Sequence, residues 1–448
     1  MPAWRYLCSR LALGNHGKNG AAAAILICVG ALSAPALADD PINPQAMVRA
    51  SGRYQAPGAL PQGAGVLDRA KPEYDALGLP VGSFRLYPTF AAGASYDDNI
   101  FRDPGATSGD MFWTFSPRLD LRSQWQQDLL QVYAQADGYA YDSHSSENRA
   151  NWLGGANSEF GIAPDTTVDA RASYFDTHES RGSPDISTAA LNPTEYSIFH
   201  TDLSVLNQPG PIGLSAGLSY DRYVYDPTPL TGGGMVDNSD RNARVLETYG
   251  KVSYEIEPGS SVFARASYNT RDFDLQFDRN GFQHRSDGYR LDGGLQMFLS
   301  PLIKGTMFLG YLQQNFKAPL QSVSGFDFGS QLDWYVTELV TVHLSTARIL
   351  ADTTIAGASN EDQRTIQTSV DYELLRNLIL QARFGYENDI FDGATRRDHI
   401  TSFGVGGNYL LDNRMSLYMR YDHSGRESTI SGTNFSDNLL SAGITLQY

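Results

Sequence analysis

From residue 85 to the end of the chain, apolar and polar side chains alternate along stretches of about ten to fourteen residues. Successive side chains of a β-strand point to opposite faces, so this period predicts strands with one apolar and one polar face. Tilted strands of that length cross an apolar layer of ~25–30 Å. The final stretch is the clearest, with these residues on its apolar side: Leu440, Ala442, Ile444, Leu446 and Tyr448.

The connections between these stretches also alternate, short and then long. Tight turns are expected near residues 163–166, 208–211, 257–260, 299–301, 375–377 and 411–413. Longer polar loops are expected at 97–111, 177–194, 226–241, 274–285, 352–362 and 426–435. Short periplasmic turns and long extracellular loops are typical of an up-and-down barrel. The pattern predicts an all-β fold, a transmembrane antiparallel β-barrel of about 18 strands (roughly 16–20) covering residues 85–448.

Aromatic residues cluster at both ends of the expected strands. One ring comprises Tyr96, Tyr141, Tyr174, Tyr220, Tyr268, Tyr386 and Tyr421. The other comprises Phe160, Tyr254, Phe298, Trp334, Tyr372, Tyr409 and Tyr448. Two such girdles are expected at the two membrane interfaces. Tyrosine is also simply common in strands, which explains its abundance but not its position.

The first 84 residues lack this pattern. Residues 1–38 have basic residues without acids, then an apolar run, then Ala36-Leu37-Ala38, and so predict a cleaved signal peptide. An uncleaved membrane anchor is the alternative. Residues 39–84 are rich in proline and glycine and are interpreted as an extended periplasmic segment, with a short plug inside the barrel as the alternative.

Charge and cysteine content exclude several classes of function. The formal net charge of −16 gives no basic surface for nucleic acid. Mean hydropathy is −0.33, which agrees with a barrel because only alternate strand residues face lipid. Cys8 and Cys28 both lie in the predicted signal peptide, so the mature chain has no thiol for a disulfide or a zinc site.

No motif for phosphate binding, zinc binding or a serine nucleophile is present, so we expect no enzyme, no cofactor and no metal. Asp176 with His178, and Asp422 with His423, are acid–histidine neighbours of the kind expected by chance. Asp97-Asp98 and the Asp237/Asp240 pair could bind calcium or bridge lipopolysaccharide. A solvated acidic rim is the simpler interpretation.

The less apolar side of each strand is expected to face the lumen. A charge facing lipid at mid-depth costs ~2–4 kcal/mol, whereas lumen charges can pair and stay hydrated. Four tyrosines on this face could either stack on sugars or pack internally: Tyr133, Tyr139, Tyr249 and Tyr418. The expected charged lumen residues are Arg118, Asp120, Arg122, Asp137, Arg171, Arg265, Arg290, Asp292, Asp333, Arg383, Glu387 and Arg420.

One stretch resembles a known family. It contains Gly82-Ser-Phe-Arg-Leu-Tyr-Pro88, Tyr96-Asp-Asp-Asn-Ile-Phe101, Pro117 and Trp125, preceded by Lys71-Pro-Glu-Tyr-Asp75. These residues resemble the putative β-barrel porin type 2 family of proteobacterial outer-membrane proteins, over about residues 70–448. The resemblance implies an outer-membrane barrel, often encoded beside exopolysaccharide genes, with no established catalytic residues.

Pattern and resemblance together predict a porin-like channel of the cell outer membrane, for exopolysaccharide export or solute passage. The alternatives are a non-conducting scaffold of an envelope polysaccharide complex and, third, a hydrolase at the barrel rim. Expected partners are outer-membrane lipid and lipopolysaccharide, the barrel-assembly machinery and polysaccharide export components, but not nucleic acid. Ile444, Leu446 and Tyr448 form the ending expected to serve as the C-terminal assembly signal.

Overall fold

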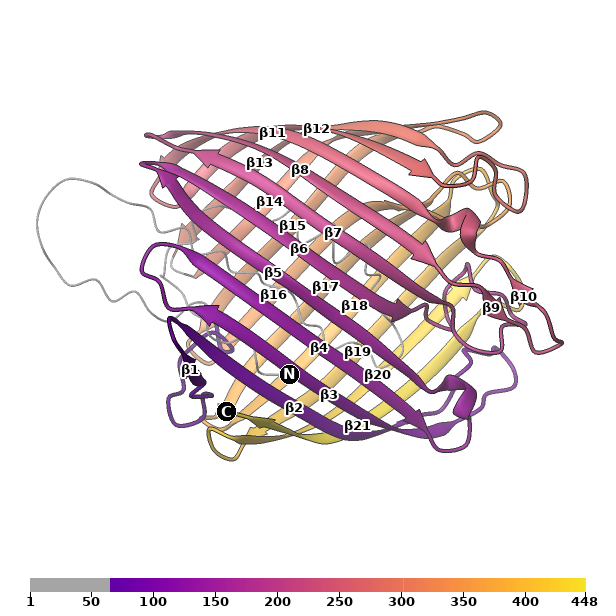
Figure 1. Ribbon diagram of the computed structural model, residues 1–448, viewed down its shortest axis with the longest axis horizontal. Coiled ribbons are helices and arrows are strands. Elements are labelled where there is room, and N and C mark those ends of the chain that lie inside the picture. The colour runs from indigo at the N-terminus through magenta and orange to yellow at the C-terminus, as the bar shows by residue number, and fades with distance from the viewer. Residues whose placement is uncertain (1–64, 301) are drawn as a thin grey trace, which may run out of the picture.

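The computed structural model describes residues 65–300 and 302–448, in which eighteen antiparallel strands close a barrel (Figure 1). This confirms the predicted fold class and strand number. The first half consists of β2 (Phe84–Asp97), β3 (Asp110–Ser123), β4 (Leu129–Tyr141), β5 (Arg149–Ala163), β6 (Thr166–His178), β7 (Glu195–Asn207), β8 (Ile212–Tyr225), β11 (Ala243–Glu257) and β12 (Ser260–Phe273). The second half consists of β13 (Ser286–Ser300), β14 (Ile303–Phe316), β15 (Val323–Thr337), β16 (Val340–Ala351), β17 (Glu361–Leu375), β18 (Leu378–Phe391), β19 (Arg397–Leu410), β20 (Met415–Ser428) and β21 (Phe435–Gln447).

A few short elements lie outside the barrel wall. They are β1 (Leu79–Val81), β9 (Thr228–Pro229), β10 (Met235–Val236) and the 3-10 helices η1 (Ser145–Glu147) and η2 (Ser239–Arg241). No helix in the described ranges is long and apolar enough to cross a membrane. The predicted signal peptide at 1–38, with both cysteines, lies outside the described residues, as do residues 39–64.

Exposure alternates along each barrel strand in step with polarity. In β11, Leu246, Val252 and Tyr254 are exposed, whereas the intervening Tyr249 and Lys251 are partly covered. We call the exposed apolar side the outer face and the opposite side the inner face. This is the arrangement that a barrel in lipid requires, with apolar groups outside and polar groups around the lumen.

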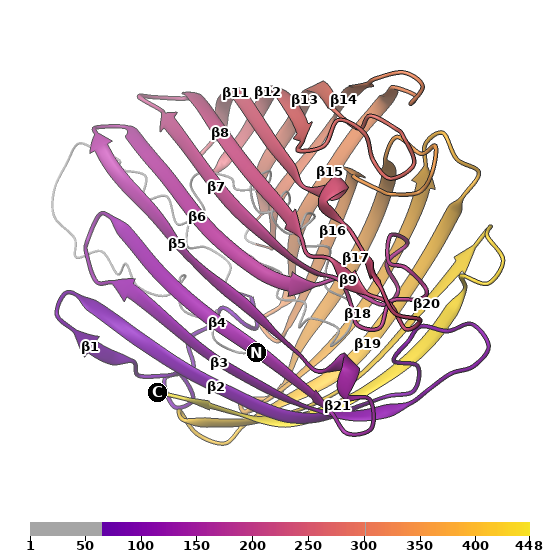
Figure 2. The same ribbon diagram turned by 45° about the vertical axis from the view of Figure 1, so that its right-hand side comes forward.

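The two ends of the barrel differ as the loop pattern predicts. One end, the short-turn end, carries tight turns such as Pro258-Gly259, where Gly259 has φ of 85°, a value that favours glycine. The other, the long-loop end, carries the connections at 98–109, 179–194, 226–242, 274–285, 352–360 and 429–434. Figure 2 shows loops folded over the opening at this end.

The barrel closes between β2 and β21. The register runs from Thr89 opposite Gln447 to Asp97 opposite Leu439, and the Tyr448 N–H donates to the Pro88 carbonyl at 3.2 Å. Closure leaves neither strand with a free edge along this ladder. β1 pairs with the first residues of β2, beyond the point where β21 ends.

Most of the predicted aromatic ring residues lie on the outer face. Tyr448 is 41% exposed there, next to Leu446 at 44%. Tyr141 is a correction: it is buried on the inner face and stacks on Phe112, with ring centroids 4.8 Å apart. Tyr141 is an odd number of residues from the outward-facing Val132, so it lies on the inner side of β4. Its position at the end of the strand did not by itself place it in the outer aromatic girdle. The side chain of Phe298 lies outside the described set.

Candidate functional site: the barrel lumen and its two ends

The structure places the charged residues expected in the lumen on the inner face. One group lies on β3 and β4, where Asp120 accepts hydrogen bonds from Arg122 at 2.7 Å and from Gln131 at 2.9 Å. Arg118 lies 3.8 Å from the same carboxylate. On the neighbouring strand Asp137 accepts from Gln135 at 2.9 Å. Burying a charge without a partner is costly. The Asp120 carboxylate reduces this cost for both Arg118 and Arg122.

Ion pairs continue around the wall between neighbouring or next-but-one strands. The interstrand pairs are Arg265–Asp292 at 2.6 Å, Arg290–Asp327 at 2.7 Å, Arg383–Asp422 at 2.5 Å and His343–Asp333 at 2.6 Å. The remaining candidates lie on the same face, with Arg171 opposite Asp202, Glu387 opposite Thr365 and Arg420 opposite Ser441. The wall is therefore polar, charged and of mixed sign.

Inner aromatic rings lie flat over glycines of adjacent strands. The Tyr249 ring covers Gly217, and the Tyr418 ring covers both Gly443 and Gly93, where an added Cβ would come within 2.6 Å of the tyrosine. Tyr133 covers Gly155 in the same way. These tyrosines pack against the wall, and the glycines provide the space for them.

A loop crosses the lumen at the long-loop end. We call residues 179–194, between β6 and β7, the strap. Its Asp185 accepts hydrogen bonds from the Thr353 hydroxyl at 2.8 Å and the Thr354 N–H at 2.7 Å, on the β16–β17 loop. Arg426 of β20 donates to the strap's Gly182 carbonyl. Because β6 and β7 lie nearly opposite β16 and β17 in the ring, the strap narrows the opening.

A second segment enters the short-turn end. We call residues 65–77 the N-terminal segment. Its Lys71 is fully buried and donates to Glu373 of β17 at 2.5 Å, and Arg69 contacts the same carboxylate at 2.6 Å. Its Val66 packs with Ile379 and Leu410, both on the inner face. Two features of the sequence pointed to this segment, the Lys71–Asp75 motif and the alternative of a plug within residues 39–84, whereas no sequence feature indicated the strap.

Comparison with known proteins identifies the family. The family model described as "Putative beta-barrel porin 2" matches residues 71–448. The chain belongs to this porin family. No curated protein matches the sequence.

Solved structures with a similar fold were also found. Pseudomonas aeruginosa OpdK with vanillate is 12% identical, with a TM-score of 0.40 over 81% of this chain and 99% of that chain. Acinetobacter baumannii OccAB4 is 12% identical with a TM-score of 0.43, over 81% and 98%. OccAB3 of the same organism is 12% identical with a TM-score of 0.42, over 82% and 100%.

The acid–histidine neighbours of this porin-family barrel do not form paired sites. Asp422 faces inward to Arg383, whereas His423 faces outward to Asn438 at 2.9 Å, because adjacent strand residues alternate in direction. His178 contacts Asn151 at 2.8 Å and Glu195 at 3.2 Å. In the described chain no group of three or more His, Cys, Asp or Glu could hold a metal ion.

Of the aspartates expected at a solvated rim, Asp237 is exposed and Asp98 is half-buried, whereas Asp97 and Asp240 are buried in loop contacts. Asp97 is fully buried and pairs with Arg102 at 2.8 Å. Asp240 of η2 accepts from the side chain and backbone of Arg279, at 2.7 Å and 2.9 Å. Burial raises the pKa of Asp240, but the Arg279 hydrogen bonds outweigh it and hold the pKa below its ordinary value of 3.8. Asp240 thus joins the β8–β11 and β12–β13 connections, whereas Asp97 pairs within the connection that follows its own strand.

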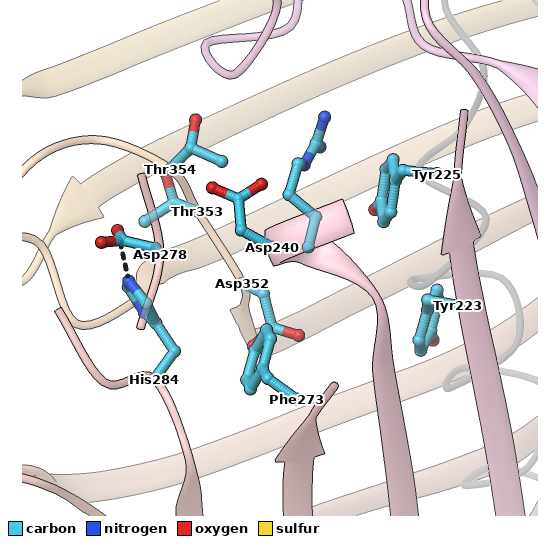
Figure 3. A pocket seen from close by; sticks show the side chains of 10 residues that line it. Tyr223, Tyr225, Asp240, Phe273, Asp278, His284, Asp352, Thr353 and Thr354 are labelled. Carbon is cyan, nitrogen blue, oxygen red and sulfur yellow. Dashed lines mark hydrogen bonds and ion pairs between the residues drawn. The ribbon is translucent and has the colours of Figure 1, made fainter. Parts of the chain in front are cut away.

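A small cavity lies beneath the loops where the strap is attached (Figure 3). Tyr223 and Tyr225 line one side, Thr353 and Thr354 another, and Asp278 accepts from His284 at 3.1 Å. Its volume of about 20 Å³ has room for a water molecule and not for a solute. The lumen, and not this cavity, is the candidate functional site.

Proposed function

We propose that this porin-family barrel is a passive channel for small polar solutes. The observation that carries the proposal is the inner wall, where ion pairs such as Arg383–Asp422 and Arg265–Asp292 line the interior of the closed barrel. Barrels of 16–18 strands are wide enough to enclose an aqueous channel. Mixed charge favours polar solutes without strong selection for one sign.

The strap and the N-terminal segment set the size of the proposed passage. One lies at each end, and both are held by hydrogen bonds to the inner wall or to opposite loops. Narrow openings favour small solutes over a polymer such as an exopolysaccharide.

Conductance of the purified barrel in planar bilayers tests this function. We expect stepwise conductance, and liposome swelling that falls with sugar size. Size-independent swelling with large oligosaccharides would favour polymer export. A folded barrel that stays electrically silent, even when Asp185→Ala and Glu373→Gln are combined, would contradict the channel and favour the scaffold role.

A further inference from the structure

A group of charged side chains lies on the outer face near the long-loop end. It consists of Arg222 on β8, Arg244 on β11, Asp272 on β12, and Arg285 and Asp274 on the β12–β13 connection. We call it the outer arginine patch. Arg222 is directly opposite Arg244, and Arg244 is directly opposite Asp272. The side chains of Arg244 and Arg285 are 59% and 62% exposed.

The patch has more guanidinium groups than carboxylates. Asp274 is shared, accepting from Arg222 at 2.9 Å and from Arg244 at 3.4 Å, while Arg285 pairs with Asp272. Asp287, lower on β13, accepts from the Asn315 amide at 3.3 Å. Like charges directly opposite each other destabilise a strand pair, so the juxtaposed Arg222 and Arg244 call for a further anion.

The position of the patch indicates which anion. Two residues below it on the outer face are Tyr220 and Leu246, followed by the exposed Tyr268 opposite Tyr289. Apolar side chains continue from there toward the short-turn end. The patch therefore lies just beyond the aromatic girdle, at the height of the lipid headgroups. Outer-membrane barrels have their longer loops on the extracellular side, which would place the long-loop end at the outer leaflet.

The patch is local to one side of the barrel. At the seam, the outward residues near the long-loop end are Tyr96, Met111 and Leu440, which are uncharged and exposed. Other exposed arginines near this end, Arg364 on β17 and Arg397 on β19, lie on separate strands, whereas three arginines meet on β8–β13.

We propose that the outer arginine patch binds the phosphate groups of lipid A, the phosphorylated glycolipid of the outer leaflet. Guanidinium groups bind phosphate through two parallel hydrogen bonds, and the exposed Arg244 lies beside Arg222, whose two terminal nitrogens donate to Asp274 at 2.9 Å and 2.5 Å. Acyl chains of the same lipid would lie along the apolar wall below. This binding is independent of whether the barrel conducts.

Lipid A binding to the full mature barrel in uncharged micelles tests the proposal, with native mass spectrometry as the readout. Each arginine near a membrane surface contributes about fivefold to anion affinity, so Arg222→Gln with Arg244→Gln should weaken binding about thirtyfold. Arg414→Gln, an exposed arginine at the short-turn end, should leave binding unchanged. Asp274→Asn removes the competing carboxylate and should tighten binding, a gain that misfolding could not produce.

Three comparisons identify the ligand chemistry. Dephosphorylated lipid A should not bind at the patch, and inorganic phosphate should compete only weakly. Equal binding by the double variant and the wild type would overturn the proposal. So would displacement of lipid A by an equal concentration of inorganic phosphate, or equally tight binding of phosphatidylglycerol.

Discussion

At the scale of single residues, the inner wall depends on pairs of small and large side chains. Tyr418 on β20 reaches across Gly443 on β21 to Gly93 on β2, and so covers the seam of the barrel. Glycine in a strand usually lowers stability because it has no side chain to pack. Here the aromatic ring provides the packing that glycine lacks.

Gly443→Ala should therefore destabilise the barrel. The added Cβ would lie 2.3 Å from the Ala92 carbonyl oxygen and 2.6 Å from the Tyr418 ring. Overpacking of this kind costs about 1–3 kcal/mol, measurable as a lower free energy of unfolding in urea. Gly250→Ala is the control, since nothing lies within 4 Å of that position. Equal stability of the two variants would contradict the packing argument.

The contact between Asp240 and Arg279 should depend on pH. The carboxylate has a pKa below 3.8 in the folded loop, so its stabilisation is complete above 3.8 and is lost as the pH falls through the lower folded value. The Arg279 N–H donates to Asp240, so its amide exchange should lose protection progressively as the pH is lowered below 3.8, after correction for intrinsic rates. In Asp240→Asn, the pH dependence of exchange at the Arg279 amide should disappear. If it persists, a group other than Asp240 is responsible for it.

At the scale of elements, two segments without regular secondary structure narrow the ends of the barrel. The strap is held by Thr353 and Thr354, at least 168 residues away in sequence, and also by the nearer Glu147 and Arg241. The N-terminal segment is held by Glu373, more than 300 residues away. Their contacts are side-chain contacts at separate points, mostly polar, whereas each barrel strand is hydrogen-bonded along both sides. Such segments are expected to open before the barrel does.

Glu373→Gln should release the N-terminal segment from the wall. The change removes the carboxylate that pairs with Lys71 and Arg69, and breaking a buried ion pair costs about 3–5 kcal/mol. Trypsin should then cleave after Arg69 more rapidly, with the thermal unfolding of the barrel little changed; Lys71 precedes Pro72 and is not a trypsin site. Glu338→Gln, an exposed glutamate at the same end, should not alter cleavage. Unchanged cleavage in Glu373→Gln would show that other contacts hold the segment.

At the scale of the whole molecule, the closed wall and the two inward segments have separate tasks. The wall is continuous and closed by the β2–β21 pairing, so it fixes the outline of the lumen. The strap spans that outline between opposite sides and should control the effective width at the long-loop end.

Asp185→Ala should increase single-channel conductance and its fluctuations. The carboxylate accepts three hydrogen bonds from Thr353 and Thr354, and hydrogen bonds to a charged group contribute about 1.5–3 kcal/mol each. Asp103→Ala is the control, because Asp103 binds only the Gly105 and Ala106 amides of its own loop. If the two variants conduct alike, the strap does not limit the passage.

Much of the wall could be predicted because strand periodicity is local. The alternation in β21 places Leu446 and Tyr448 on one face whatever the other strands do. The same rule placed Arg265 and Asp292 on the inner face, but it could not show that they pair. Tyr141 was wrongly assigned to the outer aromatic girdle. The assignment relied on its position near a strand end and not on the alternation of side chains along β4, which directs it inward.

The sequence by itself determined the fold class, the strand number, the two faces of each strand and the family, because these follow from period, turn chemistry and motif. Only the tertiary structure decided where the strap and the N-terminal segment lie, which charges pair, and that Arg222, Arg244 and Arg285 meet on one outer surface. Those features depend on register and ring closure, which bring together residues that no local pattern relates.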